Sequence, residues 1–243
     1  EALSVLLREK TERTGGPTAA AGGAVWAPLN SQTAAVGHPD SREQVMTYLH
    51  HTVGEASPQA LQEAFIDSAA QAVDYLARHT EVKLAARTYS PDYYPDRPGA
   101  ALGGRSLDPL MFDGRLLGKQ HFRELRDPLP EFLVLGGMMV TMTDAKHLLS
   151  ATKSFTSWRE GMKLVLRYVA DRLGGWHRGT RLVLGNALAA RLFKSVLDRQ
   201  IPYWLQASTR QLLHDAQGRV VGLTVQHQGR TQRVHARRGV VVA

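Results

Sequence analysis

Residues 6–30 read LLREKTERTGGPTAAAGGAVWAPLN, a short apolar run that ends in a carboxylate and is followed by a glycine-rich segment. In dinucleotide-binding folds the second strand ends in this way, and its acid accepts hydrogen bonds from the ribose hydroxyls. Glu9 has the position of that acid. The glycine fingerprint that should precede it by roughly 20 residues would lie ahead of residue 1. Glu9 alone also fits an ordinary strand end, so both interpretations stay open at this point.

Two glycine pairs, Gly15-Gly16 and Gly22-Gly23, bracket Thr18 in a loop of small residues. Glycine lets the backbone approach a phosphate or a flat ring closely, with its N–H groups available as donors. The alternative interpretation is a tight surface loop without a ligand. Glu9, a few residues earlier, favours the first interpretation.

The apolar runs at residues 2–7 and 239–243 are typical of buried strands in a parallel sheet. A domain seldom begins and ends inside such a strand, because neighbouring strands would be left unpaired. We therefore expect an α/β domain that is truncated at both ends.

Helical patterns dominate the middle of the chain. Asp40 with Glu43 at the third position predicts a capping box before a helix, and Ser57-Pro58 predicts a second helix start. Apolar residues then recur at helical spacing at Leu61, Phe65, Ala69, Val73 and Leu76. Residues 81–130 are rich in Pro, Gly, Asp and Arg and predict a long loop with short elements, a feature that is usually functional or poorly ordered.

The last hundred residues predict helices and then strands. One helix should end at Gly174-Gly175 and carry an apolar stripe, and another should follow over residues 187–197. The stripe of the first comprises Trp158, Met162, Val165, Val169 and Leu173. Residues 203–205 form a strand candidate, and residues 220–226 and 231–236 predict a hairpin across Gln228-Gly229.

Composition narrows the function classes. The 243 residues are 43% hydrophobic and suit one large or two small globular domains. The chain has no cysteine, which excludes a disulfide framework and thiol catalysis. Its 10 histidines show no metal-ligand spacing, so we expect no metal site.

The net charge of +8 permits an anionic partner, but the arginines are spread along the chain and no nucleic-acid motif is present, so we expect no nucleic-acid partner. No run of 18 apolar residues occurs, and we expect no stable membrane insertion and a cytoplasmic location.

Taken together, these segments resemble the fumarate reductase and ketosteroid dehydrogenase flavoprotein superfamily. The resemblance is carried by Glu9-Lys10, by Gly15-Gly16 with Thr18-Ala19, by Gly22-Gly23, and by Trp26-Ala27-Pro28. Pro17 and Ala21 depart from the family pattern, which has small hydroxyl residues there. Farther along, several segments are similar to the 3-ketosteroid dehydrogenase branch: Gly37 to Ser41, Pro91 to Pro95, Gly104 to Pro109, Phe112 to Gly114, Gly179 to Leu188, Gly218 to Gly222 and Arg237 to Ala243.

The resemblance implies a Rossmann-like FAD-binding domain with a largely helical insertion and a β-hairpin near the C-terminus. It implies that residues 1–33 and 179–243 form the FAD-binding parts and residues 34–178 the insertion. The implied cofactor contacts are Glu9, Lys10, Gly15, Gly16, Thr18, Ala19, Gly22, Gly23 and Thr209. Tyr93 is the implied catalytic tyrosine, although a Tyr-Tyr pair beside prolines also fits simple loop packing.

The family function implied is hydrogen removal from a 3-ketosteroid ring, with hydride transfer to the flavin and an external electron acceptor. We expect the isolated piece to be inactive. Two alternatives remain: a fumarate reductase-like flavoprotein that acts on another substrate, and a non-catalytic remnant without flavin. A dicarboxylate substrate would need an arginine cluster, and the sequence shows none.

Overall fold

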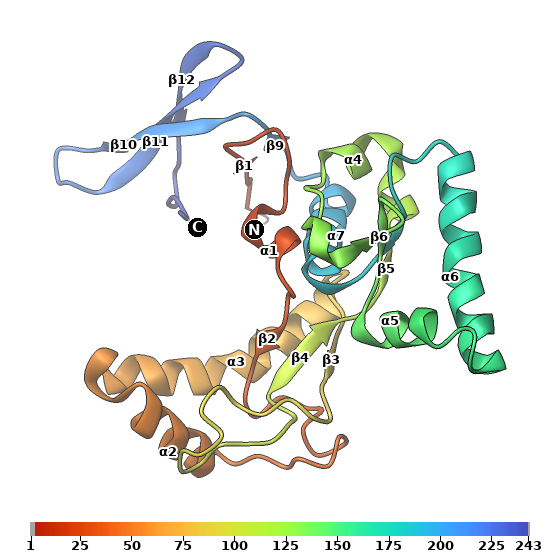
Figure 1. Ribbon diagram of the computed structural model, residues 1–243. Coiled ribbons are helices and arrows are strands. Elements are labelled where there is room, and N and C mark those ends of the chain that lie inside the picture. The colour runs from red at the N-terminus through yellow and green to blue at the C-terminus, as the bar shows by residue number, and fades with distance from the viewer. Residues whose placement is uncertain (1–2, 243) are drawn as a thin grey trace.

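Short strands form five separate small sheets within residues 3–242, which the computed structural model describes, and helices pack between them (Figure 1). The α-helices are α1 (Gly16–Ala20), α2 (Arg42–Thr52), α3 (Gln59–His79), α4 (Gly118–Glu124), α5 (Met142–Leu149), α6 (Phe155–Leu173) and α7 (Leu184–Asp198). The 3-10 helices are η1 (Gly54–Ala56), η2 (Gly114–Leu117) and η3 (Pro130–Phe132). The strands are β1 (Leu7–Arg8), β2 (Val25–Trp26), β3 (Leu84–Ala86), β4 (Ser106–Pro109), β5 (Phe112–Asp113), β6 (Leu133–Val134), β7 (Met138–Met139), β8 (Arg181–Leu182), β9 (Tyr203–Trp204), β10 (Ser208–His214), β11 (Val220–His227) and β12 (Arg230–His235).

The largest core cluster combines buried residues of α7 with residues of α1, α4 and strands β5, β7 and β8. Small residues allow the close approach of α1 and α7. A Cβ added at Gly15 would lie 3.2 Å from the Ala189 side chain, and one added at Gly185 would lie 2.0 Å from the Thr18 carbonyl oxygen. Met138 and Met139 are both buried in this part of the molecule.

The last three strands form an antiparallel sheet that stands beside β1 and α1 (Figure 1). The predicted hairpin across Gln228-Gly229 is confirmed, with His227 opposite Arg230. Both turn residues have positive φ angles, 50° and 73°, as a two-residue type I′ turn requires. The predicted strand at residues 203–205 is confirmed as β9, which pairs in parallel with β1.

A second lobe, formed by α2, α3 and the sheet β2-β4-β3, lies at the opposite end of β2 from α1 (Figure 1). The expected loop over residues 81–130 is present, and it contains short strands and helix α4. Helix α6 ends at Leu173, before Gly174-Gly175, as predicted. No described helix is long and apolar enough to cross a membrane.

The two predicted buried strands at the chain ends are wrong where the structure describes them. The first shrinks to Leu7–Arg8, and Val5 and Leu7 are exposed, because β1 has β9 as its one neighbour and β9 is two residues long. Residues 239–242 form no strand, and Val241 is 94% exposed. Ala2 and Ala243, also assigned to these strands, lie outside the described residues.

Three local predictions are also corrected. The glycine-rich loop contains a helical turn, α1, with Pro17 in its first turn. The cap of α2 is Ser41, which accepts a hydrogen bond from the Gln44 N–H, because the Asp40 carboxylate binds Arg105 instead. On α3 the buried side is formed by Gln62, Ile66 and Val73, whereas the predicted stripe residues Leu61 and Phe65 are exposed.

Candidate functional site

The end of β1 brings Glu9 close to Thr209, 200 positions away in the sequence. The Glu9 N–H donates to the Trp204 carbonyl (2.8 Å), and the Ala207 N–H donates to the Glu9 carbonyl (2.8 Å). The Arg8 guanidinium donates to the Thr209 hydroxyl (2.9 Å). Residues 8–10 and 207–209 therefore form one corner, and the Lys10 side chain is exposed beside it.

The Glu9 carboxylate is half-buried, and one of its two oxygens accepts hydrogen bonds from the protein. Its Oε1 accepts hydrogen bonds from the Thr11 N–H (2.8 Å) and the Thr11 hydroxyl (3.0 Å). These bonds hold the carboxylate in one orientation. Within residues 3–242, Oε2 makes no hydrogen bond and is left as an acceptor for a hydroxyl group.

The glycine segment has one face against α7 and one face open. Gly23 packs against Gly185, where an added Cβ would lie 2.4 Å from the Gly185 Cα. At Gly16 and Gly22 an added Cβ would meet no atom within 4 Å, and Thr18 is exposed. The backbone on this open face is therefore accessible to a flat ligand.

Ala19 lies on the other face. Its side chain is 1% exposed and belongs to the core beside α7. Its N–H donates to the Gly15 carbonyl, and its carbonyl accepts from the Asn186 amide (3.2 Å). Ala19 thus holds α1 in place, and its polar backbone atoms are already bonded within the protein.

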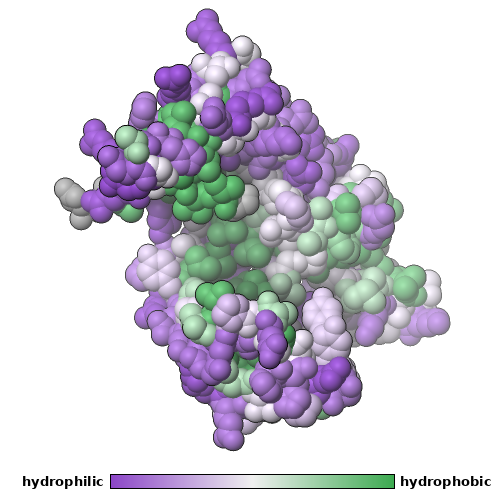
Figure 2. Space-filling model, turned by 90° about the vertical axis from the view of Figure 1, so that its left-hand side faces the viewer, coloured by the Kyte–Doolittle hydropathy of each residue, from purple (hydrophilic) through white to green (hydrophobic). Residues whose placement is uncertain are grey.

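The open face borders an apolar hollow. Figure 2 shows it between the lobe that contains β10–β12 and the lobe that contains α2 and α3, with hydrophobic residues at its floor and hydrophilic ones outside. In Figure 1 the elements on this side are β1, α1 and β2. A ligand that is partly flat and apolar fits this surface.

A charged group that was not predicted from the sequence holds Arg13, just before the glycine segment. Asp127 forms ion pairs with Arg13 and with Arg178 (2.9 Å) and a 3.4 Å contact with His177. Burial alone would raise the pKa of Asp127, but the charges of Arg178 and Arg13 outweigh it and the pKa is lowered. These residues are far apart in the sequence and carry no shared motif, so no sequence signal points to them.

His177 gives this anchor a pH dependence. Partial burial, and next the charge of Arg178, lower the pKa of His177 below its usual value. In the unfolded chain the histidine pKa is about 6.5, so the unfolded chain binds a proton more readily than the folded chain does. The free energy of unfolding therefore falls as the pH drops below about 6.5. We expect His177→Gln to remove this part of the acid sensitivity. Denaturant unfolding at about pH 7.5 and about pH 5.5 measures it.

The matched control for that prediction is His50→Gln, on an exposed ring of α2. Its unfolding free energy should change with pH as in the wild type. If His177→Gln also keeps the wild-type pH dependence, the His177 ring does not contribute to acid sensitivity.

Tyr93 lies on the loop between β3 and β4 and is 97% exposed. It makes no direct contact with the glycine segment. The link is indirect: Trp26, which directly follows that segment on β2, donates its indole N–H to the Asp92 carboxylate (2.7 Å). The Tyr93 loop is therefore connected to the site through Asp92, the residue before Tyr93.

Asp92 belongs to a buried ion group that fixes this loop. Arg105 binds Asp92 (2.7 Å) and Asp40 (2.8 Å), and all three side chains are at most 3% exposed. Burial alone would lower the pKa of Arg105, but its hydrogen bonds and ion pairs with the two carboxylates raise it. The second Asp92 oxygen also accepts the Ala101 N–H (2.9 Å).

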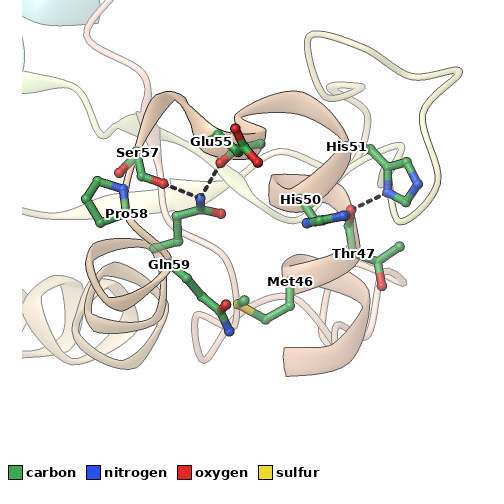
Figure 3. A pocket seen from close by; sticks show the side chains of 10 residues that line it. Met46, Thr47, His50, His51, Glu55, Ser57, Pro58 and Gln59 are labelled. Atoms are coloured by element: carbon green, nitrogen blue, oxygen red, sulfur yellow. Dashed lines mark hydrogen bonds between the residues drawn. The ribbon is translucent and has the colours of Figure 1, made fainter.

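A separate hollow of about 650 Å³ lies between α2, η1 and the start of α3 (Figure 3). Its polar side chains serve the local fold: Gln62 donates to the Gly54 and Ser57 carbonyls, and His51 bonds the Thr47 carbonyl. It contains none of the predicted site residues. We therefore do not assign it to the functional site.

The comparisons with known proteins agree with this geometry. The family model described as "FAD binding domain" matches residues 1–243. The chain belongs to this FAD-binding family. The predicted cofactor, FAD, is thereby confirmed. The open face of the glycine segment and the free Oε2 of Glu9 fit this cofactor.

Similar proteins are ketone dehydrogenases. The chain is 30% identical over its full length to 3-oxosteroid 1-dehydrogenase of Comamonas testosteroni, of which it covers 42%. It is 32% identical over its full length to 4-oxocyclohex-2-ene-1-carboxylate 5-dehydrogenase of Sinomonas cyclohexanicum, of which it covers 40%. The chain therefore spans about two fifths of these relatives, and its mixed α/β fold covers one part of such an enzyme.

A solved structure shows the same fold. The crystal structure of 3-ketosteroid delta1-dehydrogenase from Sterolibacterium denitrificans, in complex with 1,4-androstadiene-3,17-dione, superimposes with a TM-score of 0.86 at 34% identity. The match covers 98% of this chain and 42% of that one. The predicted resemblance to FAD-dependent 3-ketosteroid dehydrogenases is confirmed.

Proposed function

We propose that this chain is the FAD-binding part of a dehydrogenase that introduces a double bond next to the ring ketone of a 3-ketosteroid. The apolar hollow beside the open glycine face carries the proposal, because it suits both a flavin and a hydrophobic ring system (Figure 2). The relatives named for 3-oxosteroids support the substrate class.

We assign the cofactor contacts as follows. Glu9 accepts from a ribose hydroxyl through Oε2, with Lys10 and Thr209 beside it. The backbone of Gly16, Thr18 and Gly22 faces the cofactor. Gly15 and Gly23 border the cofactor while they hold the segment against α7, and Ala19 supports that face from the core. Residues 1–33 and 179–243 then form one Rossmann-like unit, supported by the pairing of β1 with β9 and of α1 with α7, and residues 34–178 are inserted between them.

Bound FAD supplies the acceptor for a hydride. The chain supplies positioning and a proton site. A ring ketone acidifies the neighbouring C–H bonds, and a hydrogen-bond donor to its oxygen stabilises the enolate-like transition state. We assign a proton-handling role of this kind to Tyr93. The Trp26 ring, stacked on Phe65 at 5.8 Å, offers an apolar surface to the steroid. An external electron acceptor completes the cycle.

The relative that acts on an oxocyclohexene carboxylate supports a second candidate, a small cyclic keto acid. The chemistry at the carbons next to the ketone is the same. The two candidates differ in what holds the rest of the substrate: an apolar wall for the steroid, a cationic group for the carboxylate.

A visible absorption spectrum of the full-length protein separates these proposals. Flavin bands that bleach on anaerobic addition of a 3-ketosteroid support the steroid. Bleaching by a 4-oxocyclohexane carboxylate instead supports the keto acid. Flavin bands unchanged by both would reject the ketone substrate, and a colourless full-length protein would favour a flavin-free remnant.

The cofactor assignment makes a prediction at Gly22. An added Cβ meets no protein atom within 4 Å there, so Gly22→Ala should leave the fold intact. A methyl group on the open face should separate the backbone from the flavin and weaken FAD binding by about tenfold or more. Titration of flavin-depleted protein with FAD measures this.

Gly185→Ala is the matched contrast. Its Cβ would lie 2.0 Å from the Thr18 carbonyl, so we expect a loss of both stability and FAD binding. If Gly22→Ala binds FAD as tightly as the wild type does, Gly22 does not face the cofactor.

A further inference from the structure

The loop that carries Tyr93 is a closed segment between β3 and β4. The Ser90 N–H donates to the Leu102 carbonyl (2.9 Å), and the Asp92 N–H donates to the Ala101 carbonyl (3.0 Å). These bonds join the two arms of the loop immediately before Tyr93 in the sequence. The backbone that carries Tyr93 is therefore held in one conformation.

Helix α2 supports this loop from one side. The Tyr94 N–H donates to the Tyr48 hydroxyl (3.2 Å). Gly99 has a φ of 79°, and a Cβ added there would lie 2.3 Å from the Gln44 carbonyl oxygen, so the loop backbone packs directly on the helix. The loop is thus fixed to the second lobe, while the Tyr93 side chain itself stays 97% exposed.

Trp26 holds the loop from the direction of the glycine segment. Its ring contacts Tyr48 and Phe65, with centroids 6.2 Å and 5.8 Å away. These two rings restrict rotation of the indole, whose N–H donates to the Asp92 carboxylate (2.7 Å). The Asp92 side chain is 1% exposed, and a hydrogen bond to a charged acceptor shielded from water is stronger than one between neutral groups.

The two oxygens of Asp92 have different partners. Oδ2 accepts from Arg105 (2.7 Å) and from the Ala101 N–H (2.9 Å), and these bonds keep the loop closed. Oδ1 accepts from Trp26, which lies on β2, three positions after Gly23. Loss of the Trp26 bond would therefore loosen the position of the loop relative to the glycine segment without opening the loop.

We infer that the Trp26 indole N–H is a positioning group for Tyr93: through Asp92 it sets where the Tyr93 hydroxyl lies relative to the open face of the glycine segment. Reaction rates depend steeply on such placement, since an error of about 1 Å can cost about 10²-fold. This role of the N–H is separate from the apolar surface that the same ring offers to a steroid. The inference rests on the proposed function.

The variant Trp26→Phe tests the inference, because it keeps an aromatic ring and removes the N–H. Stopped-flow reduction of the full-length, FAD-loaded protein by a 3-ketosteroid, without oxygen, separates the limiting rate from the half-saturating substrate concentration. We expect the limiting rate to fall by about tenfold or more, with a smaller change in the half-saturating concentration. Arg105 and Ala101 still hold Asp92, so the FAD content should stay at the wild-type value.

The same substitution in a Tyr93→Phe background shows whether Trp26 acts through Tyr93. Once the Tyr93 hydroxyl is absent, Trp26→Phe should slow flavin reduction by less than about twofold. A purely structural or apolar role of the ring would slow both backgrounds by the same factor. The matched control is Trp158→Phe, on α6, which lies apart from α1, β1 and β2 (Figure 1); it should be reduced at the wild-type rate.

Hydrogen–deuterium exchange over residues 87–105 gives a readout that does not depend on activity. Exchange in this loop should be faster in Trp26→Phe than in the wild type and unchanged in Trp158→Phe. If Trp26→Phe loses FAD, 3-benzothienylalanine at position 26 takes its place in the same comparisons, because it has the shape of tryptophan without the N–H.

The inference is overturned if removal of the N–H slows both backgrounds equally, or if it leaves the limiting rate unchanged while a 3-ketosteroid still bleaches the wild-type flavin. Either result leaves the proposed function standing. If neither a 3-ketosteroid nor a 4-oxocyclohexane carboxylate reduces the wild-type flavin, the proposed function is rejected, and the inference is rejected with it.

Discussion

Arg105→Met should lower the free energy of unfolding by about 3–5 kcal/mol, the usual cost of leaving a buried charge without its partner. The Arg105 side chain is 1% exposed and binds two carboxylates that are also buried, those of Asp40 (3% exposed) and Asp92 (1%). Methionine has a similar length, so the packing volume is largely kept and the loss reports on the charges. Guanidinium chloride unfolding of both proteins measures the difference.

An exposed ion pair of the same lobe provides the control. Arg42 binds Asp67 with side chains that are 50% and 59% exposed, and Arg42→Met should lower the free energy of unfolding far less than Arg105→Met does, because solvent screens the exposed pair. A loss of under about 1 kcal/mol for Arg105→Met would show that the buried group does not hold the lobe together. The triple variant that also carries Asp40→Asn and Asp92→Asn should recover part of the loss, because the unpaired charges are gone.

The parts of the fold that were predicted correctly are those with local signals. The hairpin at Gln228-Gly229 was predictable because a two-residue turn with a glycine fixes its own register. The end of α6 was predictable because a glycine pair follows the last apolar residue.

Other parts depend on contacts between distant residues. Asp40 fits a helix cap by sequence, but Arg105, 65 residues later, takes its carboxylate. The apolar periodicity of α6 correctly predicts which residues share one face of the helix. It does not predict whether that face points to the core or to solvent. Its outward direction follows from Asp171 and Gly161, which hold the opposite side.

The candidate site was predicted by resemblance more than by physics. The pattern at Glu9 alone fits any strand end, and nothing local indicates that Thr209 lies beside it. Their proximity is visible only in the structure, where Arg8 and Thr209, 201 residues apart, form a hydrogen bond. Asp127 and Arg178 carry no motif and were missed, although Asp127 pairs with Arg178 and anchors Arg13 just before the glycine segment.

Tyr93→Phe should lower kcat of the full-length enzyme by about 10²-fold or more, the usual range for a group that transfers or donates a proton in the transition state. The hydroxyl is the one group that the substitution removes. Because the Tyr93 side chain is 97% exposed, the unfolding free energy and the FAD content should stay at the wild-type values. Steady-state kinetics with a 3-ketosteroid and an artificial electron acceptor measures kcat and KM separately.

Tyr94→Phe is the matched control, one residue along the same loop and 54% exposed. It should change kcat by no more than about threefold if a proton-handling group is needed at position 93 alone. A rise in KM with unchanged kcat in Tyr93→Phe would assign Tyr93 to substrate binding. Equal, small effects of both substitutions would mean that the loop contributes shape and not chemistry, and the proton site would then have to be sought on another segment.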